Sequence, residues 1–554
     1  MSGNGELVFL PLGGAGEIGM NLNLYGLDGK WLMVDLGVTF GEDNLPGVDV
    51  VMPDPSFIEE RRSDLLALVL THAHEDHLGA VQYLWPRLGC PVYATKFTAE
   101  LLRAKLVEAP FRDAVEIREI PQGGEFAVGP FQLRMISMTH SIPESNAIAI
   151  RTRLGSVLHT GDFKIDPEPL LGRLTDESVL RDLGESGVLA MVCDSTNVFR
   201  PGESGSEGAL RVSLDDFLDG RTGQIAVTTF ASNVARLETF ALLAAKHGRH
   251  AVLVGRSLWR VAGAALAAGY LQDLPPFLND KDGAHLPPDK VLFICTGCQG
   301  EPRGAMTRIA NGDHPHVSLG AGDLVVFSSK MIPGNERAIH RLYNKLAGRQ
   351  IEVITEKDHF VHVSGHPCRD ELARMYRWVR PQVAVPVHGE RRHMAEHAAF
   401  AQSLQVPQSI EVANGTMLRL APGPVEIVDH VANGRLALDG RKLIAIDSEV
   451  LRARRRLMFQ GVVTVFLVLD SSGRLATAPR LNAQGVFEPE AESDPTAEIV
   501  AKVSAAIDSL PKRLREDDNA ISEAARLVVR RGIKRSHDKR PQISVEVVRL
   551  DMRS

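Results

Sequence analysis

Cysteine is scarce in this chain of 554 residues. An odd and small number argues against a disulfide framework and for a reducing compartment, so we expect a cytoplasmic protein. The five cysteines are Cys90, Cys193, Cys295, Cys298 and Cys368. The chain also lacks an apolar run of 18 residues, and therefore no membrane-spanning segment is expected. Its start, MSGNGELVFLPLGG, lacks the basic region and the apolar stretch of a secretory signal.

Aromatic residues and excess positive charge are also in short supply. Aromatics make up 5% of the chain and the net charge is −7, values that do not single out a nucleic-acid binder. Residues 501–554 nevertheless hold 13 Lys and Arg against 8 Asp and Glu. Local basic clusters matter more than total charge when the ligand is a polyanion, but such runs are equally typical of a solvated surface. The runs are Arg452, Arg454, Arg455 and Arg456, then Arg530, Arg531, Lys534, Arg535, Lys539 and Arg540.

Short apolar runs that end in polar or glycine-containing turns recur along the chain. Examples are LALVLTHAH (66–74), SVLHTGDF (156–163), VLAMVCDST (188–196), VLFICTG (291–297) and AVPVHGE (384–390). These runs are typical of buried strands with functional residues at their C-terminal ends. Stretches with helical apolar spacing, such as 234–248 and 370–380, separate several of them. The alternation predicts an α/β fold.

The most informative motif is THAHEDHLGA at 71–80. It places His72, His74, Asp76 and His77 within six residues, directly after an apolar strand. Imidazole nitrogen and carboxylate oxygen are the ligands that zinc prefers. Four such groups are too many for one catalytic zinc with an open position, so the motif favours two metal ions.

Three more candidate ligands follow apolar runs elsewhere in the chain. These are His140 in MTHSIPES, Asp162 in HTGDF and His388 in PVHGE. Taken alone, each is more typical of a hydrogen-bonded loop residue than of a metal ligand. Together with the cluster at 71–80 they favour a shared metal centre.

These motifs carry a resemblance to a known family. The pattern HxHxDH with a later His, an Asp after Thr-Gly and a final His resembles the metallo-β-lactamase superfamily. Longer motifs resemble its beta-CASP branch, and within it the ribonuclease J family, from residue 9 to about 460 and beyond. They are CDSTN (193–197), TTFASNVARL (228–237), TGCQGEP (296–302), SSKMIPGNE (328–336), HVSGH (362–366) and PVHGE (386–390). One departure is Cys298, at a position where serine is expected; it leaves the metal ligands untouched.

The resemblance implies a role for each candidate residue. His72, His74 and His140 would hold one zinc ion, and Asp76, His77 and His388 a second, with Asp162 bridging the two. Asp35 and Asp194 would orient the ligand imidazoles through hydrogen bonds. Manganese or magnesium remains an alternative to zinc.

The resemblance also implies a reaction and a substrate. Two metal ions would activate water and stabilise the phosphoryl transition state of RNA hydrolysis. The family implies a 5′-to-3′ exoribonuclease that prefers 5′-monophosphate ends, with some endonuclease activity, acting in mRNA decay and rRNA maturation. His366 would contact the phosphate or assist the leaving group, although a structural histidine is the alternative. Ser232, Ser364 and His366 would form the 5′-phosphate pocket, because hydroxyls and glycine-flanked backbone amides suit a phosphate.

The expected architecture is a metallo-β-lactamase four-layer αβ/βα sandwich with an inserted beta-CASP α/β domain and a small α+β C-terminal domain. The sandwich takes residues 1–205 and 360–425, and the insertion takes 206–359. Residues 426–456 are expected as an irregular linker, and 457–554 as a C-terminal domain for oligomerisation. Expected partners are single-stranded, 5′-monophosphorylated RNA, a second copy in a homodimer or homotetramer, and RNA-degradation proteins, with no membrane.

Three rival functions are weaker. The main rival among enzymes is a beta-CASP nuclease that acts on DNA or on structured RNA ends. A thioester or lactam hydrolase does not need the 150-residue insertion, and a catalytically silent scaffold would be expected to have lost ligands. Two short motifs are set aside: the GxGxxG pattern at 14–19 is followed by a strand pattern, and the C-x-x-C pattern at 295–298 ends a strand.

Overall fold

The structure is a computed structural model that describes residues 5–42, 44–488 and 495–550. The chain divides into two compact units, each described here by itself. One comprises residues 1–39 and 51–435, and the other comprises residues 40–50 and 436–554. Within the described ranges, none of the helices has the length and apolar character needed to cross a membrane.

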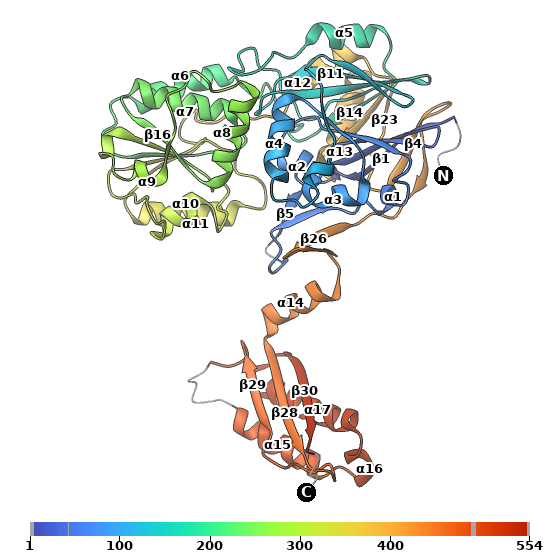
Figure 1. The fold of residues 1–554 in the computed structure, drawn as a ribbon, viewed down its shortest axis with the longest axis vertical. Coiled ribbons are helices and arrows are strands. Elements are labelled where there is room, and N and C mark those ends of the chain that lie inside the picture. Colours follow the sequence, from blue (N-terminus) through green and yellow to red (C-terminus); the bar gives the residue numbers. More distant parts are fainter. Residues whose placement is uncertain (1–4, 43, 489–494, 551–554) are drawn as a thin grey trace. The chain divides into compact units, whose positions relative to one another are not determined.

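Two mixed sheets face each other in the first unit (Figure 1). The first runs in the order β25-β24-β1-β3-β4-β7-β8-β9 and the second in the order β10-β11-β12-β13-β14-β21-β23. The first sheet contains β1 (Leu7–Gly13), β3 (Leu22–Leu27), β4 (Lys30–Val34), β7 (Leu65–Val69), β8 (Val92–Ala94), β9 (Ile117–Glu119), β24 (Thr416–Ala421) and β25 (Glu426–His430). The second contains β10 (Glu125–Val128), β11 (Phe131–Met138), β12 (Ser145–Thr152), β13 (Gly155–His159), β14 (Ala190–Asp194), β21 (Val383–Val387) and β23 (Gln408–Ser409).

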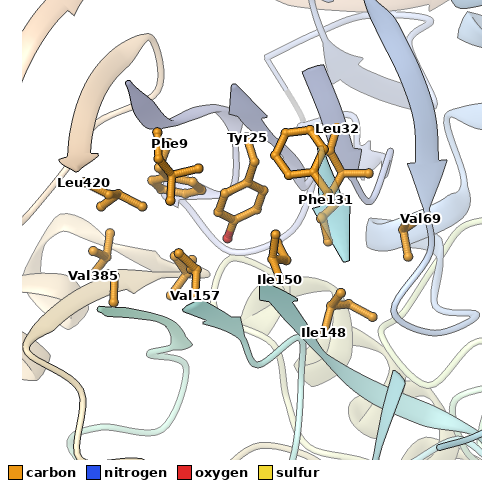
Figure 2. Close-up of a cluster of buried hydrophobic side chains, with 14 of the residues drawn as sticks. Phe9, Tyr25, Leu32, Val69, Phe131, Ile148, Ile150, Val157, Val385 and Leu420 are labelled. Carbon is orange, nitrogen blue, oxygen red and sulfur yellow. The ribbon is translucent and has the colours of Figure 1, made fainter. Parts of the chain in front are cut away.

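Alternating side chains from the two sheets form one apolar layer between them. Figure 2 shows Phe9, Tyr25 and Leu32 of the first sheet pointing toward Ile150 and Val157 of the second. Each of these side chains is fully buried. Burying an aliphatic or aromatic side chain of this size contributes about 1.5–3 kcal/mol, so this layer holds the two sheets together.

Helices cover the outer faces of the sandwich. The parallel strands β7, β8 and β9 are connected by α3 (Val81–Leu88) and α4 (Lys96–Leu106). A second apolar cluster packs α5 (Glu177–Glu185), α12 (Arg369–Val379) and α13 (Arg391–Ser403) on the second sheet. The four-layer sandwich expected from the sequence is thereby confirmed.

An inserted domain follows the strand β14 (Figure 1). Its six strands are all parallel, in the order β17-β16-β18-β15-β19-β20, with helices on both faces. The strands are β15 (Ile225–Thr228), β16 (His250–Val254), β17 (Leu278–Asn279), β18 (Val291–Cys295), β19 (Leu324–Phe327) and β20 (Glu352–Ile354). The helices are α6 (Glu207–Leu218), α7 (Val234–Lys246), α8 (Arg256–Ala268), α9 (Asp280–Gly283), α10 (Ala305–Asn311) and α11 (Glu336–Gly348).

Polar contacts join the inserted domain to the sandwich. The Tyr270 hydroxyl donates to Glu144 Oε1 across 3.1 Å, and Arg236 Nη2 donates to the carbonyl of Val363 across 3.4 Å. Arg236 is fully buried and forms an ion pair of 2.6 Å with Glu207. The guanidinium therefore holds the chain segment that leads to the HVSGH turn.

The second unit contains a small α+β domain. Its three strands are β28 (Val462–Leu469), β29 (Arg480–Gln484) and β30 (Gln542–Arg549), in the order β29-β28-β30. Alternate side chains of β28 pack on α15 (Thr496–Asp508) and α17 (Asp518–His537) in a separate apolar cluster. The α+β domain expected after residue 456 is confirmed as a fold.

The segment 426–456 is ordered, contrary to the irregular linker expected for it. It forms β25, the hairpin of β26 (Arg435–Asp439) and β27 (Lys442–Ala445), and α14 (Glu449–Gln460). All five residues of β25 are exposed, so no apolar alternation indicates a strand there. Ser448 caps α14, and Arg454 forms a bidentate ion pair with Asp439. Backbone pairing and this cap order the segment without an apolar pattern.

Candidate metal centre

The turn after β7 is built around the buried carboxylate of Asp35. Asp35 Oδ1 accepts the backbone amide of Thr71 at 2.8 Å, and Oδ2 accepts its hydroxyl at 2.8 Å. Oδ2 also accepts a hydrogen bond from Nδ1 of His77 at 2.7 Å. Donation from Nδ1 leaves Nε2 of His77 as the nitrogen that faces the other candidate ligands.

Three imidazoles and one carboxylate form the first donor group. His72, His74, His140 and Asp162 each offer an atom within 4.8 Å of the others. Nδ1 of His74 lies 3.0 Å from Nε2 of both His72 and His140. Nδ1 of His140 donates to the carbonyl of Gly365 at 2.6 Å, which turns Nε2 toward the group.

A second donor group shares the carboxylate of Asp162. Asp76, His77, Asp162 and His388 likewise offer atoms within 4.8 Å of one another. His388 Nε2 lies 3.2 Å from Asp76 Oδ2, and His77 Nε2 lies 3.2 Å from Asp162 Oδ2. The seven residues predicted as ligands are therefore brought together, and Asp162 lies between the two groups.

A third group involves the residues predicted to act around the metals. Asp162, Asp194, His366 and His388 also lie within 4.8 Å by their donor atoms. His366 Nδ1 is 2.8 Å from Asp194 Oδ2 and 3.8 Å from Asp162 Oδ2. Asp194 accepts the amide and the hydroxyl of Thr196 on its other oxygen, so its carboxylate is held in place.

The electrostatics of the centre separate neutral from charged groups. Burial lowers the pKa of His74 to about 4, and it lowers the pKa values of His72 and His140 well below their ordinary range. Burial alone would raise the pKa of Asp162, but His388 and His77 outweigh it and leave that pKa well below its usual value. Neutral imidazoles around an anionic carboxylate are the protonation states that metal ions require of their ligands.

The pKa values of His77 and His366 are shifted upward, opposite to those of the three histidines of the first donor group. Burial lowers the pKa of His77, but Asp162, Asp76 and Asp35 outweigh burial and raise the pKa well above its ordinary value. For His366, the carboxylates of Asp194 and Asp162 likewise outweigh burial and raise the pKa to about 9. Several carboxylates thus attract positive charge into the centre, either as protons or as metal ions.

The donors fit divalent metal ions. Nδ1 of His388 is buried and has no hydrogen-bond partner among the described residues, although it lies 3.4 Å from Asp162 Oδ1. A buried imidazole nitrogen without a partner is costly unless an ion or another group satisfies it. Nitrogen and carboxylate oxygen in this ratio match the ligands of zinc and related transition metals.

The predicted phosphate pocket is placed in part. Ser364 is buried, and its hydroxyl accepts from Asn197 Nδ2 at 2.8 Å and from the backbone amide of His366 at 3.3 Å. Ser232 is half-buried in the turn between β15 and α7. The described contacts do not join Ser232 to Ser364 or His366, so its place in a pocket stays a prediction.

The glycine-rich motif at 14–19 has a structural role. The pair β2 (Ala15–Gly16) runs beside β22 (Gly389–Glu390), and the carbonyl of Gly14 accepts from the amide of His388 at 2.6 Å. A strand follows the motif, as the sequence indicated, instead of the helix that a dinucleotide site needs. This loop thus fixes the backbone of His388, which has a φ of 50°.

Several residues that position the candidate ligands were not predicted from the sequence. Asn21 lies 3.2 Å from His77 Nε2 by its amide nitrogen, and Thr71 and Gly365 hold His72, His77 and His140 in place. Asn197 connects Ser364 to the backbone of His366. These contacts join segments that are distant in the sequence. The only signal for these residues is that several of them lie within the motifs that carry the ligands.

The fold and the centre define the class of the protein as a metal-dependent hydrolase with a metallo-β-lactamase sandwich and an inserted α/β domain. Family models match most of the chain: the metallo-beta-lactamase superfamily at 21–219, the ribonuclease J beta-CASP domain at 222–346, the Zn-dependent metallo-hydrolase RNA specificity domain at 350–407 and the ribonuclease J C-terminal domain at 449–550. The chain belongs to the ribonuclease J family and is a metal-dependent ribonuclease, as the resemblance predicted.

Individual relatives agree with the family models. Ribonuclease J of Sinorhizobium meliloti is 45% identical over 99% of this chain and 98% of its own. Ribonuclease J of Mycolicibacterium smegmatis is 37% identical over 99% and 98%, and that of Thermus thermophilus is 36% identical over 82% and 81%. A solved structure of a protein of unknown function from Enterococcus faecalis V583 covers 75% of this chain and all of its own, with a TM-score of 0.53 and 17% identity. That likeness shows the fold alone.

Proposed function

We propose that the chain binds two zinc ions and degrades single-stranded RNA from a 5′-monophosphate end in the 5′-to-3′ direction, with endonuclease cleavage as a secondary activity. The observation that carries the proposal is the position of Asp162 in all three donor groups, beside His366. His72, His74 and His140 would hold one ion, Asp76, His77 and His388 the other, and Asp162 both. When bound, the ions would supply a Lewis acid and lower the pKa of water for attack on the phosphodiester.

The residues around the ligands keep this arrangement rigid. Asp35 fixes the ring of His77, and Gly365 fixes the ring of His140, each by accepting a short hydrogen bond from Nδ1. Such supporting contacts typically change metal affinity or activity by about 10–100-fold when they are removed.

His366 is the candidate that touches the scissile phosphate. Its ring is about one quarter exposed, and its Nδ1 is held by Asp194 at 2.8 Å. This hydrogen bond leaves Nε2 free to face a substrate. With Nε2 protonated, the imidazole would donate to a phosphate oxygen or give a proton to the leaving 3′-oxygen.

A pocket formed by Ser232, Ser364 and His366 would select the 5′ end. Hydroxyls and backbone amides near Gly365 can surround one phosphate group. We propose that a triphosphate lacks room in this pocket, so that 5′-monophosphorylated RNA is the preferred substrate.

End-labelled RNA tests the direction of degradation. The probe is a 30-nucleotide unstructured RNA with a labelled 5′-monophosphate, incubated with the zinc-loaded full-length chain. We expect immediate release of labelled mononucleotide, whereas a 3′-labelled probe should shorten only gradually. Release of labelled oligonucleotides as the first products would overturn the exonuclease proposal.

Substrate and metal controls separate the parts of the proposal. Equal rates on 5′-monophosphorylated and 5′-triphosphorylated RNA would show that no pocket selects the 5′-monophosphate. Single-stranded DNA of the same sequence tests the rival DNA substrate. Addition of a chelator should stop cleavage of every probe, and zinc should restore it more fully than manganese or magnesium.

Family membership supports further proposals about the cellular role of the chain and its assembly. We propose roles in mRNA decay and rRNA maturation in the cytoplasm, with a homodimer or homotetramer formed through residues 457–554 and with RNA-degradation proteins as partners. All five cysteines are buried and free, consistent with a reducing compartment. The domain limits 1–205, 206–359 and 360–425 likewise stay proposals.

A further inference from the structure

Lys330 is a half-buried lysine where the inserted domain faces the sandwich. It follows β19, and its ammonium donates to Asn197 Oδ1 across 3.1 Å. Among the described residues, this ammonium forms no ion pair with a carboxylate, and Glu356 acts on it only through its charge. A cation withdrawn from water loses solvation free energy, and a neutral amide compensates only part of that loss.

The partner of Lys330 also holds the turn that carries His366. Asn197 Nδ2 donates to Ser364 Oγ at 2.8 Å and to the carbonyl of His366 at 2.9 Å. One amide side chain therefore connects the ammonium to the two residues predicted to contact phosphate. Only the side chain of Asn197 separates the charge of Lys330 from Ser364 and His366 in this network.

The surroundings of Lys330 add positive charge and an unsatisfied polar atom. Burial and the neighbouring charge of Arg200 lower the pKa of Lys330 to about 8, against the opposing charge of Glu356. Arg200 is exposed, lies close enough to act on Lys330 through its charge, and forms no ion pair with any described carboxylate. Nδ1 of His362 is buried without a hydrogen-bond partner among the described residues, and the charge of Lys330 helps to lower the pKa of this imidazole. Two cations that lack carboxylate partners are suited to a polyanion.

We propose that Lys330 binds a phosphate group of the RNA next to Ser364 and His366, with Arg200 contributing to the same positive potential. This proposal rests on the proposed function, because it requires RNA to pass beside His366. A lysine acts on phosphate as a point charge, so the contact tolerates any base. The phosphate is either the 5′-terminal group or an internal phosphodiester, and the experiment separates these two sources.

The test compares three variants of the full-length, metal-loaded chain. Lys330→Met removes the charge, and Lys330→Arg keeps it. Lys345→Met is the matched control, because Lys345 also donates to an asparagine, Asn311, but is exposed on α11. Each variant is assayed for kcat and KM on 5′-monophosphate and 5′-hydroxyl RNA between 50 and 200 mM salt. Thermal unfolding of each variant checks the fold.

A phosphate contact has a specific signature in these data. Lys330→Met should raise KM about tenfold while kcat changes less than about twofold. The slope of log KM against log salt concentration should fall by about 0.7, the value for one phosphate contact on a single strand. Lys330→Arg should keep most of the slope, and Lys345→Met should match the unchanged chain.

The two RNA ends identify the phosphate. If Lys330→Met changes KM and its salt slope on 5′-monophosphate RNA but not on 5′-hydroxyl RNA, Lys330 binds the terminal phosphate. If the changes are equal on both RNAs, Lys330 binds an internal phosphate. An unchanged salt slope on both RNAs would overturn the proposal. So would an equal fall in kcat and thermal stability for Lys330→Met and Lys330→Arg, which would indicate a structural role. If the chain cuts RNA only internally and the slope still falls, the exonuclease proposal fails and the Lys330 proposal stands.

Discussion

The carbonyl oxygen of Gly365 accepts a hydrogen bond of 2.6 Å from Nδ1 of His140, although 225 residues separate the two in the sequence. The contact joins the segment after the inserted domain to a candidate metal ligand on the sandwich. It leaves no space for a side chain at residue 365, because a Cβ there would lie 2.8 Å from Cε1 of His140 and 2.9 Å from Oγ of Ser141.

Gly365→Ala should therefore displace His140 and weaken metal binding. We expect a fall in activity of about 10–100-fold, the usual effect of disturbing a ligand's support. Activity measured across a zinc titration checks this prediction. Gly263→Ala is the control, since a Cβ at that position in α8 meets no atom of the described residues within 4 Å. A Gly365→Ala chain with ordinary activity and zinc affinity would show that His140 can shift without consequence.

Asp35→Asn should loosen the second donor group. Asp35 Oδ2 accepts both the Thr71 hydroxyl and His77 Nδ1, and an amide nitrogen at that position cannot accept either. We expect about 10–100-fold weaker zinc binding, measured by competition with a chelating dye. Asp64→Asn removes a carboxylate from a surface pair with Lys30 and should leave zinc affinity unchanged. Equal zinc affinity in the Asp35→Asn chain would contradict the role assigned to Asp35.

Replacement of His366 should slow the chemical step. His366→Ala removes the imidazole, and Asp194→Asn removes the charge that holds it at 2.8 Å. We expect kcat to fall by about 10²–10⁴-fold for His366→Ala, the range of acid–base catalysis. If Asp194 acts through His366, adding Asp194→Asn to His366→Ala should cost little more. Single-turnover rates on 5′-monophosphate RNA provide the measurement. Fully additive losses of rate would show that Asp194 and His366 act independently.

The buried ion pair between Arg236 and Glu207 should contribute more to the free energy of unfolding than an exposed ion pair does. Both side chains are almost fully excluded from solvent, and Arg236 also donates to Ser328 and Val363. Glu207→Gln leaves an unpaired buried guanidinium, so we expect a loss of about 3–5 kcal/mol in the free energy of unfolding.

Urea unfolding and hydrogen exchange of the α7 amides measure this loss. Glu177→Gln removes the partner of Arg181 in an exposed helix pair and should cost less than about 0.5 kcal/mol. A Glu207→Gln chain as stable as this control would mean that Arg236 finds other compensation.

The sequence predicted the fold class and the candidate ligands because both depend on local signals. Apolar strands end at the ligand motifs, and those motifs are long enough to identify a family. The contacts that hold the ligands could not be predicted, because Gly365 and Asn197 act on residues more than 160 positions away. The elements between 426 and 460 were missed because β25 is exposed throughout, β26 and β27 are only five and four residues long, and α14 buries a single side chain, so none of them shows an apolar period.

The number of metal ions bound by the purified chain is the decisive measurement for the two donor groups. His72 belongs to one donor group and His388 to another, so the two groups together are expected to hold two ions. Elemental analysis after dialysis should give two zinc ions per unchanged chain, and close to one for His388→Ala under the same conditions. One zinc or none in the unchanged chain at saturating zinc would show that the donor groups do not hold two ions.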